Sequence, residues 1–251
     1  MPRIFLPEAS SDTGHITVTG EKAHYISTVL RCRNGDRIFI SDAKGTTYTT
    51  EIISTSQKSV TLTIMHVSDS PAADSPLQIT LFQGLLKGAK MDLVVQKATE
   101  LGVRSIVPVI TERSQLRATR KLPRWRKIAE EASRVAGRSF IPEICGTAQF
   151  EQFVSGTHAD PVQNSILFWE EGGKALSGVT ARMRNSDPIS VFVGPEGGFS
   201  QQEAELASDN GIAICTLGKR MLRAETAAIS VLAILQYALG DMGDPETITG
   251  T

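Results

Sequence analysis

Cysteine is scarce in this sequence, and the few cysteines form no cluster. Cys32, Cys145 and Cys215 lie far apart in a chain of 251 residues, and neither a C-x-x-C pair nor a cysteine–histidine group occurs. An odd and scattered set of cysteines excludes the disulfide framework of a small secreted domain and offers no ligand set for structural zinc. We therefore expect a protein without a bound metal.

Long apolar runs are also missing. The first residues, MPRIFLPEASSD, lack the apolar core of a signal peptide. The most apolar segment, residues 224–239, is interrupted by Glu225, Thr226, Ser230 and Gln236, which is typical of a buried helix and not of a membrane span. These absences predict a cytoplasmic protein with no membrane partner.

The chain carries almost no net charge, but its charges are unevenly distributed. The formal net charge is −1. Residues 87–138 contain 13 lysines and arginines against 5 acidic residues, whereas residues 139–210 contain 3 against 10. Such an asymmetry on a nearly neutral protein indicates a local nucleic-acid surface, although the two segments could also neutralise each other in the fold.

A strand, a glycine-rich loop and a helix follow one another twice near the C-terminus. Apolar residues 189–193 lead into GPEGGF, and Ser200 with Glu203 has the capping-box spacing of a helix start. A second strand at 212–217 leads into GKRMLR and a helix from Ala224. Glycines at strand ends let a backbone approach a ligand closely, and open α/β sheets bind ligands at the carboxyl ends of their strands. Two such loops predict one cofactor pocket.

The first loop excludes some cofactors. It contains neither a Walker A motif nor G-x-G-x-x-G, and its one ionisable residue, Glu196, would repel a triphosphate. A ligand with little negative charge fits better. The alternative is a purely structural turn, because Gly-Pro-x-Gly-Gly is ordinary turn composition.

The chain has two differently patterned parts. Apolar and polar residues alternate in residues 1–67, which predicts a small all-β barrel with one helical interruption at 21–30. Residues 68–76 have the composition of a linker. The rest alternates strands and helices, which predicts an α/β fold with a parallel sheet and helices on both faces. Besides the two strands already named, strands are expected at 77–83, 105–110, 141–145 and 166–169, and helices at 90–101, 123–136 and 148–154.

A run of seven bases without an acid spans the start of the helix at 123–136. Its members are Arg113, Arg117, Arg120, Lys121, Arg124, Arg126 and Lys127. The helix should pack through Trp125, Ile128, Ala132 and Val135, with Arg124 and Lys127 outward. We interpret the run as a phosphate-binding surface, with a merely solvated helix face as the alternative.

Several motifs together resemble one known family. GPEGGF and LGKRMLRAETA, with KGAKMDLVVQKATELGV, VPVITERSQ and RWRKIAEEASRVAGR upstream, are similar to the RsmE-like ribosomal RNA small-subunit uridine-N3 methyltransferase family of the SPOUT class. The resemblance covers nearly the whole chain. The sequence departs from the family at Arg134-Val135-Ala136, where many members have a Glu-Gln-Ser-like run.

The resemblance implies a fold and an activity. Residues 1–70 would form a PUA-like RNA-binding β-barrel, and residues 76–244 a parallel-sheet SPOUT methyltransferase domain with a C-terminal trefoil knot. The knot comes only from the resemblance, since topology rules alone argue against threaded chains. The implied reaction is transfer of a methyl group from S-adenosylmethionine to N3 of a uridine in small-subunit (16S) ribosomal RNA or the 30S subunit, by a homodimer. The helix at 224–239 offers a broad apolar surface for the dimer, made by Ala227, Ala228, Val231, Leu232, Leu235 and Leu239.

The resemblance and the loops together assign roles to individual residues. Arg223 is the candidate catalytic residue, placed to stabilise a uridine anion, with an ion pair to Glu196 or Glu225 as the alternative. No residue is a convincing general base. The expected cofactor-binding residues are Leu167, Gly194, Glu196, Gly197, Gly198, Leu217, Gly218, Met221, Leu222 and Thr226. The expected RNA-binding residues are Arg31, Arg113, Arg117, Lys121 and Arg124.

Two other functions fit parts of the sequence. One is ribose 2′-O-methylation of RNA by another SPOUT enzyme. The other is a non-catalytic RNA-binding assembly factor that uses the barrel and the basic run alone. The two glycine loops weigh against the second, because a pure binder needs no cofactor pocket.

Overall fold

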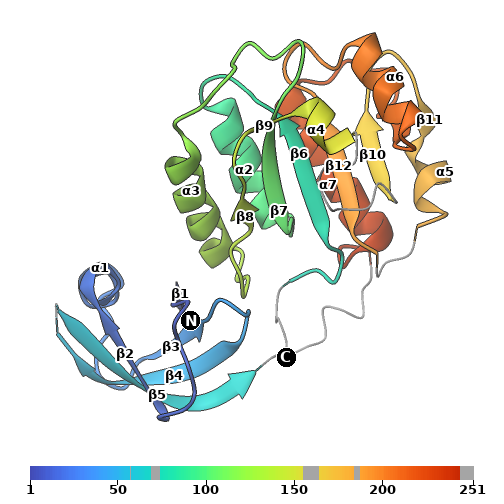
Figure 1. The fold of residues 1–251 in the computed structure, drawn as a ribbon. Coiled ribbons are helices and arrows are strands. Elements are labelled where there is room, and N and C mark those ends of the chain that lie inside the picture. Colours follow the sequence, from blue (N-terminus) through green and yellow to red (C-terminus); the bar gives the residue numbers. More distant parts are fainter. Residues whose placement is uncertain (57, 69–73, 155–163, 184–186, 244–251) are drawn as a thin grey trace. The chain divides into compact units, whose positions relative to one another are not determined.

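The computed structural model describes residues 1–56, 58–68, 74–154, 164–183 and 187–243. The chain divides into two compact units (Figure 1). The N-terminal unit comprises Met1–Asp74 and Ser133–Ile141, and the C-terminal unit comprises Ser75–Ala132 and Pro142–Thr251.

The N-terminal unit is built on a five-stranded sheet in the order β1-β3-β4-β5-β2. Its strands are β1 (Arg3–Phe5), β2 (His15–Thr19), β3 (Arg37–Ser41), β4 (Thr47–Thr55) and β5 (Ser59–Ser68). The expected alternation is present, since Val60 and Leu62 of β5 are fully buried while Thr61 between them is not. Their side chains pack in one core with those of β2 and β3.

The helical interruption predicted at 21–30 lies where expected but has an unusual form. It begins as α1 (Gly20–His24) and continues as a π-helical turn, η1 (Tyr25–Val29). The Ser27 hydroxyl donates a hydrogen bond to the Ala23 carbonyl, a contact that competes with regular helical bonding.

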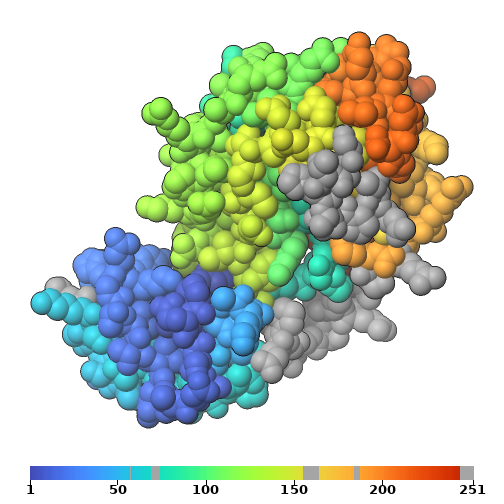
Figure 2. All heavy atoms as spheres, viewed as in Figure 1, coloured from blue at the N-terminus to red at the C-terminus, as the bar shows by residue number. Residues whose placement is uncertain are grey.

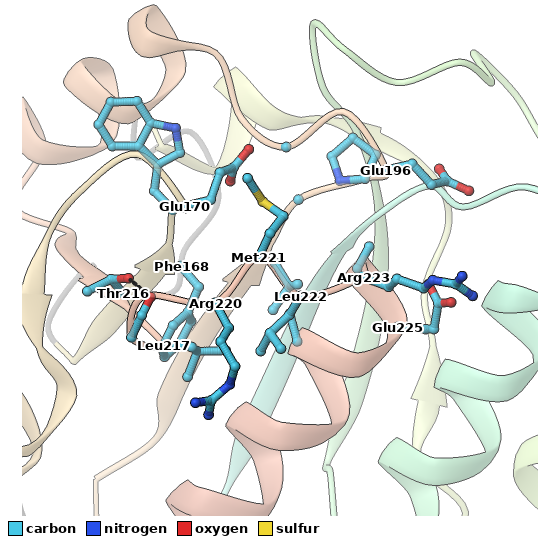
Figure 3. Close-up of a pocket in the computed structure, with 18 of the residues that line it drawn as sticks. Phe168, Glu170, Glu196, Thr216, Leu217, Arg220, Met221, Leu222, Arg223 and Glu225 are labelled. Atoms are coloured by element: carbon cyan, nitrogen blue, oxygen red, sulfur yellow. Dashed lines mark hydrogen bonds between the residues drawn. The ribbon is translucent and has the colours of Figure 1, made fainter.

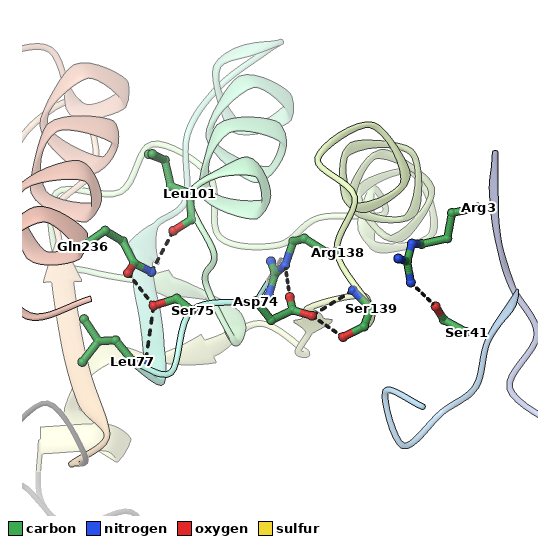
Figure 4. A network of polar contacts seen from close by, with 9 residues as sticks. All are labelled: Arg3, Ser41, Asp74, Ser75, Leu77, Leu101, Arg138, Ser139 and Gln236. Carbon is green, nitrogen blue, oxygen red and sulfur yellow. Dashed lines mark hydrogen bonds and ion pairs between the residues drawn. The ribbon is translucent and has the colours of Figure 1, made fainter. Parts of the chain in front are cut away.

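The end of the predicted linker is fixed by hydrogen bonds. Residues 69–73 lie outside the described residues, but Asp74 accepts hydrogen bonds from Arg138 Nε at 2.8 Å and from the backbone and hydroxyl of Ser139 (Figure 4). Ser75 Oγ donates to Gln236 Oε1 at 2.7 Å. The side chains of Asp74 and Arg138 are almost fully buried, so this end of the predicted linker is held in the N-terminal unit. Composition could not show it, because the partners lie far along the chain.

The C-terminal unit contains a parallel sheet in the order β11-β13-β10-β12-β6-β7-β8, with β9 paired to β7. Its strands are β6 (Ile79–Gly84), β7 (Ser105–Ile110), β8 (Glu143–Ile144), β9 (Ala148–Gln149), β10 (Ser165–Phe168), β11 (Lys174–Ala175), β12 (Ile189–Val193) and β13 (Ala213–Thr216). The α/β class is thereby confirmed. The trefoil knot stays a prediction.

Helices cover both faces of this sheet. They are α2 (Lys90–Glu100), α3 (Leu122–Val135), α4 (Phe150–Val154), α5 (Leu176–Thr180), α6 (Gln201–Asp209) and α7 (Ala224–Leu239). Helices α2 and α7 pack together, and α4 packs with α6 on the other face (Figure 1). In the space-filling view, the segment from β7 to α3 (green) and the segment around α4 (yellow) adjoin on the visible surface of this unit (Figure 2).

Several expected elements differ in detail. The strand at 141–145 shrinks to β8, and the helix at 148–154 begins only at Phe150, because Ala148 and Gln149 pair with β7 as β9. The strands β9 and β11 and the helix α5 were not expected, since two to five residues give too little periodicity. Val135 is 70% exposed and not on the core face of α3, because the buried stripe runs through Trp125, Ala129 and Ala132.

No helix in the described part of the chain is long and apolar enough to cross a membrane. Among the same residues, no group of three or more histidine, cysteine, aspartate or glutamate side chains could hold a metal ion.

Candidate functional site

A cavity of about 750 Å³ lies at the carboxyl ends of three adjacent strands, β13, β10 and β12. The segments that follow these strands form most of its wall (Figure 3). The lining residues are Phe168, Trp169 and Glu170 after β10; Val193, Gly194, Pro195, Glu196 and Gly198 after β12; Thr216 to Glu225 and Ala227 after β13; and Lys90 of α2. This edge is where open α/β sheets bind ligands.

The loop after β12, residues 194–199, is held tightly by its neighbours. A Cβ on Gly84 would lie 2.3 Å from Pro195 N, so β6 needs glycine where this loop crosses it. Gln83 Nε2 donates to Gly194 O at 3.1 Å, and Trp169 Nε1 donates to Phe199 O at 3.2 Å. The loop is therefore fixed in its conformation before any ligand binds.

Gly198 is required by its own backbone and by its surroundings. Its φ is +69°, a conformation that favours glycine, and a Cβ there would lie 1.9 Å from Glu170 Oε1. The Gly198 N–H donates to Pro195 O at 3.0 Å and closes the turn. Glu170, which the sequence analysis did not single out, thus occupies the space that the missing side chain leaves.

Glu196 forms an ion pair inside the cavity. Its Oε1 accepts hydrogen bonds from Lys90 Nζ at 2.9 Å and from the Lys87 backbone N–H at 3.2 Å. Burial acts to raise the pKa of Glu196, but these hydrogen bonds outweigh it and hold the pKa below its ordinary value. Its Oε2 is buried with no hydrogen-bond partner in the described chain, so a ligand donor can still bind there.

The β12 loop is also braced from the end of β7. Glu203, the capping-box residue of α6, accepts hydrogen bonds from Ser200 N at 2.9 Å and from Glu112 N at 2.8 Å. The expected capping box is thereby confirmed. Burial raises the pKa of Glu203 above its ordinary value, although both backbone N–H groups act in the opposite direction.

Arg113 makes the second brace. Its Nη1 donates to Gly197 O at 3.2 Å and lies 3.7 Å from Glu171 Oε1. A Cβ on Gly197 would lie 3.0 Å from Arg113 Cβ. Gly197 is therefore glycine because Arg113 packs on it, and Gly197 is not among the residues that line the cavity.

The loop after β13, residues 217–223, has far fewer contacts. Thr216 Oγ1 donates to Gly218 O at 3.3 Å. Gly218 has a φ of +94°, and a Cβ on it would meet nothing within 4 Å. The Met221 side chain is 82% exposed at the mouth of the cavity. This loop is open to whatever the cavity binds.

Seven of the ten expected cofactor residues line the cavity: Gly194, Glu196, Gly198, Leu217, Gly218, Met221 and Leu222. The other three do not. Gly197 packs on Arg113, Leu167 is fully buried in the apolar core, and Thr226 is exposed on α7. Leu167 is separated from the cavity because side chains alternate along β10, and the next residue, Phe168, reaches the lining instead.

Arg223 and Glu225 begin α7 and both line the cavity. The sequence left open an ion pair of Arg223 with Glu196 or Glu225. Neither ion pair is present among the described residues, and Glu196 pairs with Lys90 instead. Glu225 Oε2 is buried without a hydrogen-bond partner. The Arg223 guanidinium is thus available to a ligand.

Two family models match this chain. An RNA methyltransferase domain matches residues 73–236, and an RNA methyltransferase PUA domain matches residues 18–65. A Synechocystis ribosomal RNA small subunit methyltransferase E is 31% identical over 226 residues, which are 89% of this chain and 73% of the relative. The chain belongs to the ribosomal RNA small subunit methyltransferase E family.

Solved structures of this fold extend the comparison over almost the whole chain. One is a ribosomal RNA small subunit methyltransferase E of Neisseria gonorrhoeae bound to S-adenosyl methionine, with a TM-score of 0.84, 33% identity and coverage of 96% of this chain and 99% of that one. Another is a Legionella pneumophila methyltransferase in complex with S-adenosylmethionine, with a TM-score of 0.83, 32% identity and coverage of 96% and 98%.

The cations expected to bind RNA are mostly engaged within the protein. Arg117 donates to the carbonyls of Thr111 and Glu112 at 2.9 and 2.8 Å, and Lys121 Nζ donates to Gly88 O at 2.8 Å. Arg124 pairs with Asp92 at 2.9 Å, and Trp125 Nε1 donates to the same carboxylate. Phosphate contact by these residues stays a prediction, and a phosphate would have to compete with these bonds. Arg31, in the N-terminal unit, is exposed with a φ of 55°.

Several residues that line the cavity were not predicted from the sequence. Glu170 directly follows the strand predicted at 166–169 and Thr216 lies at the end of the strand predicted at 212–217, and this position at a strand end was a usable signal. Lys90 had none, because its contact with Glu196 joins residues 106 positions apart.

Proposed function

We propose that this protein transfers a methyl group from S-adenosylmethionine to N3 of a uridine in small-subunit (16S) ribosomal RNA. Membership of a ribosomal RNA methyltransferase family supports the reaction class. The observation that carries the proposal is the cavity at the ends of β10, β12 and β13, which the two glycine loops line. The uridine-N3 position is supported by the GPEGGF, LGKRMLRAETA and KATELGV motifs.

The cavity fits S-adenosylmethionine by the chemistry of its wall. The unpartnered oxygen of Glu196 can accept a hydrogen bond from a hydroxyl, amine or ammonium group. The open face of Gly218 lets a ligand approach the backbone closely. Residues Gly194, Gly198, Leu217, Gly218, Met221 and Leu222 would hold the cofactor, which supplies an activated methyl group when it is bound.

Arg223 is the proposed catalytic residue. Methylation at N3 requires the uridine imide to lose its proton, and a fixed positive charge stabilises the anion that forms. Arg223 lines the cavity and is exposed, without an ion pair among the described residues. The rest of the rate enhancement would come from holding N3 in line with the methyl group.

RNA binding is proposed for both parts of the chain. Residues 1–70 would act as a PUA-like RNA-binding domain, and residues 76–244 as the knotted methyltransferase domain. The match of residues 18–65 to a PUA domain supports the first assignment. The target base must leave its stack to reach the cavity, at a few kcal/mol unless it is already single-stranded.

A homodimer is proposed on a different surface of α7 from the one the sequence indicated. The sequence indicated an apolar surface made by Ala227, Ala228, Val231, Leu232, Leu235 and Leu239. The last five are buried within the chain's own fold, and Ala227 is half-buried in the lining of the cavity. The exposed apolar residues of this helix are Ile234 and Tyr237. Light scattering at micromolar concentration should give twice the mass of one chain, and a monomer would contradict the proposal.

A reverse-transcription assay tests the reaction. A methyl group on uridine N3 removes the donor that pairs with adenine, whereas a ribose 2′-O-methyl group leaves the pairing edge intact. Purified protein with S-adenosylmethionine should therefore create a sharp stop in ribosomal RNA from a strain that lacks the modification. Methyl incorporation without a stop, and with alkali resistance of the adjacent bond, would establish ribose methylation instead. RNA binding without methyl incorporation would establish a non-catalytic binder.

A further inference from the structure

The cavity has two chemically different ends. Phe168, Leu217 and Thr216 lie at one end, whereas Glu196, Arg223 and Glu225 lie at the other, on the side of α2 (Figure 3). Lys90 reaches the same end through its ion pair with Glu196. One end of the cavity therefore brings together two carboxylates and two cations.

The two carboxylates at the charged end differ in their bonding. Glu196 is engaged by Lys90 and by the Lys87 backbone. Glu225 has no hydrogen bond or ion pair in the part of the chain that the structure describes, and its Oε2 is buried. A buried acceptor without a partner is unfavourable unless a ligand supplies the donor.

We propose that Glu225 accepts the N3–H of the target uridine and removes its proton during methyl transfer. This inference rests on the proposed function and supplies the general base that the sequence did not reveal. The edge of uracil presents an acceptor, a donor and an acceptor in a row. A carboxylate beside cationic donors is complementary to that edge, with Glu225 facing N3–H and Arg223 facing a carbonyl oxygen.

The electrons and atoms of the step balance. The N3–H bond breaks and its proton moves to a Glu225 oxygen. The electron pair left on N3 forms the bond to the methyl carbon, and the pair of the broken sulfur–methyl bond stays on the sulfur of S-adenosylhomocysteine. Arg223 stabilises the negative charge on the uracil oxygens while the proton is being transferred.

The same arrangement explains a preference for uridine. Cytidine has no proton on N3 and carries an amine where uridine has a carbonyl oxygen. It would bring a lone pair against the Glu225 carboxylate and an amine against the Arg223 guanidinium. Glu225 is thus both a recognition and a catalytic group.

Two variants separate these roles. Glu225→Gln keeps a carbonyl oxygen that can accept N3–H but cannot take up the proton, whereas Glu225→Ala loses both properties. Glu205→Gln is the matched control, because Glu205 is exposed on α6 and its side chain accepts one hydrogen bond among the described residues, from Gln201. In single-turnover assays, Glu225→Gln should methylate about 100-fold to 10,000-fold more slowly, while Glu205→Gln keeps the wild-type rate.

Three further readouts exclude a merely structural effect. Calorimetry should give the same cofactor affinity, within about twofold, for wild type and Glu225→Gln. Without cofactor, the preference for a short RNA with uridine over one with cytidine at the target position should survive in Glu225→Gln and fall about tenfold in Glu225→Ala. The N3–H of 5-fluorouridine is more acidic than that of uridine. RNA that contains 5-fluorouridine should therefore raise the methylation rate of Glu225→Gln by a larger factor than it raises the rate of wild type.

The outcomes are distinguishable. If the wild-type protein binds cofactor but creates no N3-methyluridine, the proposed function and this inference both fall. If it does create N3-methyluridine and Glu225→Gln keeps the wild-type rate, only the inference is overturned. A tenfold loss of cofactor affinity in Glu225→Gln would also overturn it, because Glu225 would then be a cofactor ligand.

Discussion

The two glycine loops of the cavity each join a strand to a helix, but they are held very differently. The β12 loop is fastened by Gln83, by the Trp169 side chain and by the Lys90–Glu196 ion pair. The β13 loop has the Thr216–Gly218 hydrogen bond and an exposed Met221 among its described contacts. The β12 loop therefore has a fixed conformation without a ligand, whereas the conformation of the β13 loop can become more ordered when a ligand binds.

This difference indicates how one cavity can be both rigid and accessible. A rigid loop positions the cofactor at little entropic cost, because its conformation is fixed in advance. A loop with few contacts opens locally at low free energy, and ligand-binding segments are commonly of that kind.

The largest effect is expected where the rigid loop admits no side chain. Gly198→Val places a β-branched residue at a φ of +69° and pushes its Cβ into Glu170. The left-handed conformation alone costs about 1–2 kcal/mol for a residue with a Cβ. We expect S-adenosylmethionine affinity, measured by calorimetry, to fall at least about 100-fold with the added displacement of the loop.

Gly20→Val is the control for this variant. Gly20 has a φ of +66° in the N-terminal unit, and a Cβ there would meet nothing within 4 Å. The control should keep wild-type cofactor affinity. Equal affinity of Gly198→Val and wild type would show that the β12 loop does not bind the cofactor.

A smaller effect is expected from the brace between the β12 loop and β7. In the wild type, the two oxygens of Glu203 accept hydrogen bonds from the backbone N–H groups of Ser200 and Glu112. Glu203→Gln keeps one of these acceptors and replaces the other by an amide NH₂, which faces a backbone N–H group that it cannot accept from. We expect a loss of about 2 kcal/mol in urea unfolding of the C-terminal unit. Glu205→Gln on the same helix should change stability by less than about 0.5 kcal/mol.

The pH dependence of this brace has a definite sign. The pKa of Glu203 is raised above 4.5 in the folded protein, so the folded state binds the proton more tightly than the unfolded state. The contribution of this group to stability is therefore largest below pH 4.5 and falls as pH rises through the raised value. Glu203→Gln should remove that fall, and a fall of unchanged size would contradict the assignment.

Hydrogen exchange should separate the two loops directly. With saturating S-adenosylmethionine, amide exchange in residues 217–223 should slow by at least about tenfold, because the ligand orders a loop that has few contacts of its own. Exchange in residues 194–199 should slow by less than about threefold. Peptide-resolved mass spectrometry measures both, and equal protection of the two loops would remove the distinction between them.

The smallest effects are expected in the run of seven bases between Arg113 and Lys127. Some of these side chains are hydrogen-bonded within the protein and others are not. Arg120 and Lys127 have no hydrogen bond or ion pair among the described residues, so they are the better phosphate contacts. Replacing both by alanine should lower the slope of log affinity for RNA against log salt by about 0.7–0.9 for each lost contact. Fluorescence titration at several salt concentrations measures this slope, and thermal unfolding should not change.

Arg117→Ala should affect stability and not RNA binding, the reverse of the alanine variants of Arg120 and Lys127. It removes the hydrogen bonds to the carbonyls of Thr111 and Glu112 and should destabilise the protein by about 1 kcal/mol. An unchanged melting temperature together with a lower salt slope would show that Arg117 serves RNA and not the loop.

Local chemistry determined much of this protein from the sequence alone. Apolar runs placed β7 and β12 at their observed bounds, and Ser200 with Glu203 marked the start of α6. The glycines after two strands located the cavity, because a strand end and a missing side chain are both local properties. The motifs around them carried the family.

Tertiary structure decided which of these residues line the cavity and which hold the surrounding loops in place through hydrogen bonds. Glu196 bonds to Lys90, Gly197 to Arg113 and Glu203 to Glu112. Each of these hydrogen bonds joins segments that are distant in sequence and that the sheet brings together. The order of parallel strands in a sheet is not encoded in hydrophobic periodicity, so these contacts could not be predicted from spacing. For the same reason, the sequence alone could not show that the Glu225 carboxylate keeps a buried oxygen without a partner in the described part of the chain.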